Sequence, residues 1–424
     1  MIFAEIIGCK SSNNKQNVDA VKANSFIIPV NSIPFEYNGL ICIKASIDNV
    51  KSSFIIDSGA DWFWLDSTFH YSNNKQNYNY KNFTVSGIGN STQNVSYIMD
   101  SLLISLSKNK SYFTRSVPVI NLKSIGGDIV DGLIGTDFLE KRIIELNYEK
   151  EYLRVLSDIN NIEISRYKKI EMKIINYRYY IPLTVKINDS ITIKGDFMID
   201  TGNPTSDFTS SVADKFNLNK TIPHKVRYYS KYGGVGGESS GFDFITDSVQ
   251  ISDYSFGGVI MSFSSDESGI MADEEYLGIV GNNILERFDI VFDFKENYLY
   301  LKPNSNFNEP FIPDKLGFYY VDRCKTKGGW VVKGFYENSS AEKQGLKTDD
   351  IIISVNGISV EKISNKDQKD FFTNLNKAEL TVKRGEIIKS IEIDLQPILW
   401  ISTGGNSRLT LCKWISFGLL KSFT

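Results

Sequence analysis

The stretch Phe54-Ile55-Ile56-Asp57-Ser58-Gly59 is matched 143 residues later by Phe197-Met198-Ile199-Asp200-Thr201-Gly202. In both stretches a short apolar run, typical of a buried strand, ends at an aspartate, and a glycine that permits a tight turn follows two residues later. A carboxylate at the end of a buried run has to be paired or solvated, which indicates a cleft. A single Asp-Ser-Gly is an ordinary turn, so the informative feature is its repetition.

A second pair of stretches recurs at a similar distance from these aspartates. Asp131–Glu140 resembles Leu277–Glu286, and each contains two apolar residues followed by glycine. These glycines lie 78 residues after the first aspartate and 81 residues after the second. The sequence therefore predicts a duplicated lobe, with one copy over about 39–155 and the other over about 180–303.

Strand-like runs fill both repeats. They are rich in Val, Ile, Tyr and Phe and are separated by Gly, Asn and Ser, so each lobe is expected to be mainly β. Duplicated lobes place like elements about a pseudo-twofold axis, which would bring Asp57 and Asp200 to one site. The predicted fold class is mainly β: a two-lobed, duplicated β-barrel followed by a small α/β unit.

Length and composition exclude several classes of protein. The 424 residues predict two or three domains, and 47 Lys and Arg against 50 Asp and Glu argue against a nucleic-acid binder held by phosphate contacts. The 42% hydrophobic content suffices for packed cores, and no stretch approaches the ~18 apolar residues of a membrane-spanning helix. With two histidines and no Cys-x-x-Cys pair, we expect no metal and no cofactor.

Domain boundaries follow from the repeats and from a cluster of three prolines at positions 303, 310 and 313, which marks a linker. The predicted order is an N-terminal segment (1–38), a first lobe (39–165), a second lobe (166–303), a Pro-rich linker (304–313), a third unit (314–397) and a tail of unassigned role (398–424).

On the two Asp-x-Gly loops and the two apolar-apolar-Gly elements, residues 39–303 resemble the aspartic proteases, both the pepsin-like and the retroviral-type members. The resemblance implies that Asp57 and Asp200 are the catalytic pair. The residues that would support the loops, with hydroxyls that lock one loop to the other, are Ser58, Gly59, Thr201 and Gly202. Because both loops lie on one chain, the catalytic unit is expected to be monomeric.

Two glycine-rich stretches follow the loops at similar offsets and are interpreted as flaps, hairpin tips able to close over a substrate. Their residues are Gly87, Ile88 and Gly89 in the first lobe and Gly234, Val235 and Gly236 in the second. Two flaps resemble the retroviral type more than the pepsin-like type, which has one. The alternative for the first stretch is an ordinary loose hairpin.

Several other conspicuous side chains have ordinary structural interpretations. The three neighbouring aromatic residues Trp62, Phe63 and Trp64 are interpreted as core. Both histidines, His70 and His224, lie in polar stretches and are expected to be solvated. The aspartates interpreted as surface or loop-capping carboxylates are Asp61, Asp128, Asp131 and Asp137.

The third unit resembles a PDZ domain of the bacterial protease-associated type over about 314–396. In that family a Leu-Gly-Phe loop presents backbone N–H groups to a peptide carboxylate, which implies that Leu316, Gly317 and Phe318 bind peptide C-termini. The alternative is a small α/β domain that only packs against the protease. Because the unit lacks both Asp loops, its removal is expected to spare cleavage of short peptides.

The N-terminus contains Ile6-Ile7-Gly8-Cys9 followed by a polar tract, which resembles a bacterial lipoprotein processing box. Lipidation of Cys9 would anchor the protein to a membrane outside the cytoplasm, in a bacterial envelope; otherwise the protein is expected to be soluble. Only eight residues precede Cys9, and Glu5 interrupts them, whereas a secretory segment needs 7–15 apolar residues. The recorded start is therefore truncated or the match is a coincidence.

Together these features predict a single-chain aspartic endopeptidase that acts on peptide or protein substrates and carries a PDZ-like module. A water activated by the Asp57/Asp200 pair would hydrolyse the peptide bond. The competing hypothesis is a catalytically inactive protein that holds peptides in the protease-like cleft and the PDZ-like groove. A third class, a surface-anchored interaction protein, depends on Cys9 alone.

Overall fold

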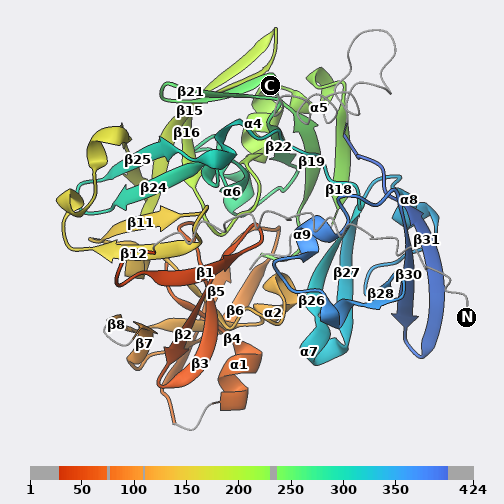
Figure 1. The fold of residues 1–424 in the computed structure, drawn as a ribbon, viewed down its shortest axis with the longest axis horizontal. Helices are drawn as coiled ribbons and strands as arrows, with labels where there is room; N and C mark the ends of the chain where they lie inside the picture. The colour runs from red at the N-terminus through yellow and green to blue at the C-terminus, as the bar shows by residue number, and fades with distance from the viewer. Residues whose placement is uncertain (1–27, 74–76, 108–109, 230–235, 400–424) are drawn as a thin grey trace, which may run out of the picture.

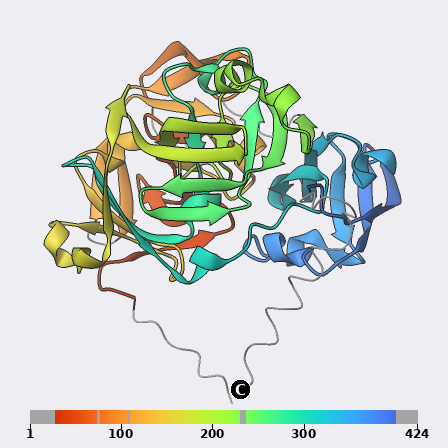
Figure 2. The same cartoon turned by 90° about the horizontal axis from the view of Figure 1, so that it is seen from above.

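The computed structural model describes residues 28–73, 77–107, 110–229 and 236–399. Two β-rich lobes lie against each other, and a smaller third unit is set to one side of them (Figures 1 and 2). The predicted fold class, mainly β with two duplicated lobes and a small α/β unit, is confirmed. Within the described ranges no helix has the length and apolar character needed to cross a membrane.

The first lobe is built almost entirely of strands. Its elements are β1 (Ile33–Tyr37), β2 (Ile41–Ile47), β3 (Val50–Ile56), β4 (Trp64–Asp66), α1 (Ser67–Asn73), β5 (Tyr80–Ser86), β6 (Thr92–Ile98), β7 (Leu102–Ser107), β8 (Lys110–Thr114), β9 (Val117–Ile120), α2 (Lys123–Gly126), β10 (Gly132–Ile134), α3 (Thr136–Leu139), β11 (Ile143–Asn147) and β12 (Tyr152–Leu156). Strand β10 pairs in parallel with β3 and antiparallel with β4.

The second lobe repeats this arrangement. Its elements are β13 (Lys168–Glu171), β14 (Lys173–Ile175), β15 (Arg178–Asn188), β16 (Ile191–Ile199), β17 (Asp207–Phe208), α4 (Ser210–Lys215), α5 (Leu218–Thr221), β18 (Lys225–Tyr229), β19 (Ser240–Ile245), β20 (Ser248–Ile251), β21 (Tyr254–Gly257), β22 (Ile260–Ser264), β23 (Gly278–Val280), α6 (Asn282–Leu285), β24 (Phe288–Asp293) and β25 (Tyr298–Pro303). Here β23 pairs in parallel with β16 and antiparallel with β17, as β10 does with β3 and β4.

A shared sheet joins the two lobes. Strand β11 of the first lobe pairs antiparallel with β24 of the second, from Ile143 opposite Asp293 to Asn147 opposite Asp289. Buried side chains of both lobes, among them Leu146 and Ile290, belong to one continuous apolar core. The lobes are therefore held at a fixed separation, which a site formed between them requires.

The third unit has its own core, centred on the fully buried Trp330. Its elements are β26 (Phe318–Arg323), α7 (Cys324–Lys327), β27 (Gly329–Tyr336), α8 (Ser340–Lys343), β28 (Ile351–Val355), β29 (Ile358–Ser359), α9 (Gln368–Phe371), β30 (Lys377–Arg384) and β31 (Ile387–Asp394). Its sheet is not separate from the lobes, because β27 pairs with β18 of the second lobe.

Three of the ordinary interpretations were wrong. The Trp62 side chain is 46% exposed, although its neighbours Phe63 and Trp64 are buried. His70 is buried, and its Nε2 lies 2.8 Å from the Tyr80 hydroxyl. Asp128 is also buried, because the third unit packs over it and the Thr326 N–H of that unit donates a hydrogen bond to its carboxylate.

Candidate active site

Asp57 and Asp200 each begin the loop that follows a buried strand. The Asp57 N–H donates to the Ile134 carbonyl at 3.0 Å, and the Asp200 N–H donates to the Val280 carbonyl at 3.1 Å. Those carbonyls end β10 and β23, the strands that pair in parallel with β3 and β16. The apolar-apolar-Gly elements therefore fix where each aspartate leaves its strand.

Ser58 and Thr201 bind the two loops together by a reciprocal set of hydrogen bonds. The Ser58 hydroxyl donates to the Ile199 carbonyl at 2.7 Å and accepts from the Thr201 N–H at 3.0 Å. The Thr201 hydroxyl donates to the Ile56 carbonyl at 2.8 Å and accepts from the Ser58 N–H at 3.1 Å. Because each hydroxyl both donates and accepts across the lobe boundary, neither loop can shift without breaking bonds to the other.

The two carboxyl groups face each other between the loops, close enough for the charge of Asp57 to act on Asp200. Asp57 Oδ1 accepts from the N–H groups of Gly59 and Ala60, both at 2.9 Å, whereas Asp200 Oδ1 accepts from the Gly202 N–H at 2.8 Å. The glycines are required by space. A Cβ on Gly59 would lie 2.5 Å from Asp200 Oδ2, and one on Gly202 would lie 2.3 Å from the Asp57 Cγ.

Burial and mutual repulsion raise the pKa of this pair. Burial raises the pKa of the Asp200 carboxyl well above 3.8, and the neighbouring Asp57 charge raises it further. Burial also raises the pKa of Asp57, against the hydrogen bonds from Asp200, Gly59 and Ala60, which favour its ionised form. Two carboxyls this close retain one shared proton.

An ion pair across the lobe boundary adjoins the pair of aspartates. Arg178, at the start of β15, donates to the Gly59 carbonyl at 3.2 Å and to Asp61 Oδ2 at 3.0 Å. Its positive charge counteracts the rise in the pKa of both Asp57 and Asp200. The prediction of Asp61 as a surface or loop-capping carboxylate did not include this contact, because nothing in the sequence links Asp61 to an arginine 117 residues away.

The tip of the first predicted flap contacts Gly236 of the second. The first is the hairpin of β5 and β6, whose tip holds Gly87, Ile88 and Gly89, and the second is the hairpin of β18 and β19. The Gly236 N–H donates to the Ile88 carbonyl at 2.9 Å, and the Gly236 carbonyl accepts from the Ser91 N–H at 2.7 Å. Gly234 and Val235 lie outside the described residues, as does Cys9.

The first flap tip reaches an apolar cluster on the second lobe. The Ile88 side chain packs against a buried group formed by Tyr180, Met198, Met271, Tyr276 and Ile279. Ile279 belongs to β23, which lies directly beneath the Asp200 loop. Buried apolar side chains of the second lobe therefore lie beneath the tip of the first predicted flap and beside the Asp200 loop.

The predicted peptide-binding loop of the third unit is partly engaged within the chain. Gly317 has φ +71°, a left-handed conformation that favours glycine, and the Phe318 side chain is buried in the core. The Leu316 N–H donates to Asp314 Oδ1 at 2.7 Å. A carboxylate of the chain therefore already lies at the loop that the resemblance assigns to a peptide carboxylate.

The outer edge of β26 is also partly covered. The Asp322 carbonyl accepts from the Asp128 N–H of the first lobe at 2.8 Å. The Asp322 side chain accepts from Gln368 Nε2 of α9 at 2.6 Å, which links the two sides of the groove. Any peptide that adds to this edge would meet the first lobe at Asp322.

Comparison with known proteins supports part of this picture. Residues 307–383 match the family model of the PDZ domain. The third unit contains a PDZ domain. Among solved structures, basic 7S globulin from soybean is similar at 12% identity, covering 66% of this chain and 98% of that chain, with a TM-score of 0.37. Conglutin gamma from lupine seeds is similar at 16% identity, covering 65% and 95%, with a TM-score of 0.39. No curated protein matches the chain.

Proposed function

We propose that the chain is an aspartic endopeptidase whose catalytic groups are the carboxyls of Asp57 and Asp200. One observation carries the proposal: the carboxyl groups of Asp57 and Asp200 face each other between loops that Ser58 and Thr201 lock together. Such a pair supplies an acid and a base at one point. It is formed within a single chain, so no second copy is needed to complete it.

The roles of the two carboxyls follow from their partners. Asp57 accepts two backbone N–H bonds and is therefore the ionised member, which acts as general base on a water between the carboxyls. Asp200 holds the shared proton and donates it to the scissile carbonyl oxygen as water attacks. The roles then reverse to expel the amine. This division of labour is the established pattern of the aspartic proteases.

The proposed substrate class is a peptide bound between the two lobes beside the paired carboxyls. The tip of the first flap bonds to Gly236 of the second, and Ile88 at that tip packs on the buried cluster around Tyr180 and Tyr276. The test is digestion of a peptide library by the purified chain from pH 3 to pH 7, and absence of any cleavage would remove the proposal.

The raised pKa of Asp200 predicts a pH-dependent gain in stability for Asp200→Asn. An unfolded carboxyl loses its proton near pH ~4, whereas the folded pair retains one to higher pH. Stability from this proton is fully present below pH ~4 and is lost as the pH rises through the folded pKa. We expect the variant to have a higher Tm than the parent at pH 7 and an equal Tm at pH 3, measured by calorimetry. If the difference in Tm between variant and parent were the same at pH 3 and pH 7, the raised pKa of Asp200 would be contradicted.

The PDZ domain supports peptide binding, and we further propose that it binds free peptide C-termini. Because the Asp314 carboxylate lies at the loop, it repels an incoming carboxylate. We expect Asp314→Asn to tighten binding of a free-acid peptide about fivefold while leaving the amidated peptide unchanged, by calorimetry on the full chain. The exposed Asp394→Asn is the control. If the free-acid and the amidated peptide bound with equal affinity in every variant, the proposal that this domain binds peptide C-termini would be wrong.

A further inference from the structure

The second flap is part of the PDZ domain's sheet. Strand β18, one side of that flap, pairs with β19 on one edge and with β27 on the other. The register places Tyr228 opposite Tyr336 and Tyr229 opposite Phe335. The first flap differs, since in the described part of the chain β5 pairs with β6 alone. Figure 1 shows β27 beside β18 at this seam.

Side chains on both faces of the sheet stabilise this pairing of β18 with β27. The Tyr336 hydroxyl donates to Asp243 of β19, and both residues are buried. The Tyr229 hydroxyl donates to Glu342 Oε1 of α8 at 2.6 Å. A backbone bond of 2.8 Å from Glu337 to the Arg227 carbonyl continues the ladder. Bonds to carboxylates are stronger than neutral ones, so these contacts fix the flap to the PDZ domain.

The opposite side of the PDZ domain is fixed to the first lobe. Asp128 accepts from Arg323 Nε at 2.8 Å and from the Thr326 N–H at 2.9 Å. Asn38 Nδ2 donates to the Asn365 side chain at 2.7 Å. The PDZ domain therefore bridges the body of the first lobe and the flap of the second, and it can hold that flap in a fixed position relative to the first lobe.

We propose that the PDZ domain is a positioning element for the second flap, and that Tyr336 and Glu342 are positioning residues for hydrolysis. This rests on the proposed endopeptidase function. Because β19 already pairs with β22, β18 would be the edge strand of its sheet without β27, and pairing on both edges holds β18 in one conformation. A flap held in place keeps water out and orients the substrate. Under this proposal, and contrary to the expectation from the sequence, removing the PDZ domain should slow the cleavage of short peptides.

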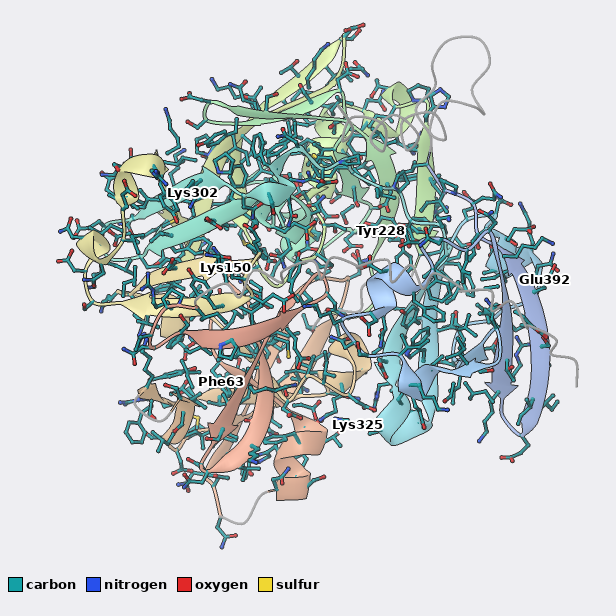
Figure 3. The ribbon with its side chains drawn as sticks, viewed as in Figure 1. Phe63, Lys150, Tyr228, Lys302, Lys325 and Glu392 are labelled. Atoms are coloured by element: carbon teal, nitrogen blue, oxygen red, sulfur yellow. The ribbon has the colours of Figure 1, made fainter. Side chains whose placement is uncertain are left out.

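The test compares Tyr336→Phe and Glu342→Gln with two matched controls. Tyr112→Phe removes a buried hydroxyl that has no hydrogen-bond partner within the described residues. Glu392→Gln removes an exposed carboxylate on β31, on the far side of the PDZ domain from Tyr228 (Figure 3). Each flap-side variant is expected to lower kcat/KM for a short peptide about tenfold, mainly through KM, while both controls leave it unchanged.

Backbone hydrogen exchange of residues 225–229 provides a readout that does not depend on activity. Faster exchange there in both flap-side variants, together with the rise in KM, supports the proposal. Faster exchange with unchanged kinetics, or unchanged exchange, overturns it. If Tyr336→Phe fails to fold, Glu342→Gln decides alone, since its site is only half-buried. A wild-type chain that cleaves nothing removes the endopeptidase function instead, and peptide affinity then replaces KM as the measure of flap positioning.

Discussion

Asp57→Asn and Asp200→Asn are each expected to abolish peptide hydrolysis while leaving the fold intact. The reaction needs one ionised and one protonated carboxyl at the same moment, and an amide supplies neither. We expect kcat to fall by at least about a thousandfold in either variant. Asparagine is close in shape to aspartate, and removing one charge from a crowded buried pair relieves repulsion, so the folded state should not be weakened at neutral pH.

Three comparisons make this result specific. The double variant should be scarcely slower than either single one, because the two carboxyls act as a unit. The control Asp189→Asn removes a carboxylate that is almost fully exposed and should retain full activity. The activity of the parent should be bell-shaped in pH, with its maximum on the acid side of neutrality, where one shared proton is retained.

Substantial hydrolysis by Asp57→Asn or Asp200→Asn, with contaminating proteases excluded, would remove the pair from the mechanism. Peptide binding without cleavage in both parent and variants would instead favour a protein that holds peptides in the cleft. Calorimetric titration with a peptide therefore belongs beside the kinetic assay.

The duplicated architecture could be predicted because it depends on local patterns repeated at matched spacing. Each apolar run before an aspartate is a strand, β3 or β16, and each apolar-apolar-Gly element is its parallel partner, β10 or β23. The pairing of these strands and the matched interval between the motifs have the same cause, which is the fixed size of the lobe. A fixed lobe size sets how far the chain runs before it returns beneath the loop.

Contacts between distant segments could not be predicted, because no local pattern encodes them. Arg178 lies on the second lobe and reaches Asp61 on the first. Asp128 follows Gly126 and Gly127 and looks like a loop residue, yet the PDZ domain covers it. The pairing of β18 with β27 joins two units that the sequence separates by a proline-rich linker. Each depends on how the units pack together.

Gly202→Ala is expected to cause a second large loss of activity, by a purely steric route. Gly202 does not have a positive φ, so alanine fits its backbone, but the added Cβ would lie 2.3 Å from the Asp57 Cγ. Asp57 must then shift by roughly an ångström, and a displacement of this size in a catalytic group costs about a hundredfold in rate. The loss should therefore fall mainly on kcat.

Gly257→Ala is the matched control, since a Cβ there would meet no described atom closer than 3.8 Å and its φ is also not positive. It should retain full activity. In Gly202→Ala, increased separation weakens the coupling between the carboxyls, so the two limbs of the pH–rate profile should move toward each other. If Gly202→Ala kept the rate and the pH–rate profile of the parent, the Asp57 carboxyl would have kept its catalytic position. The close approach of the two loops would then not matter to the chemistry.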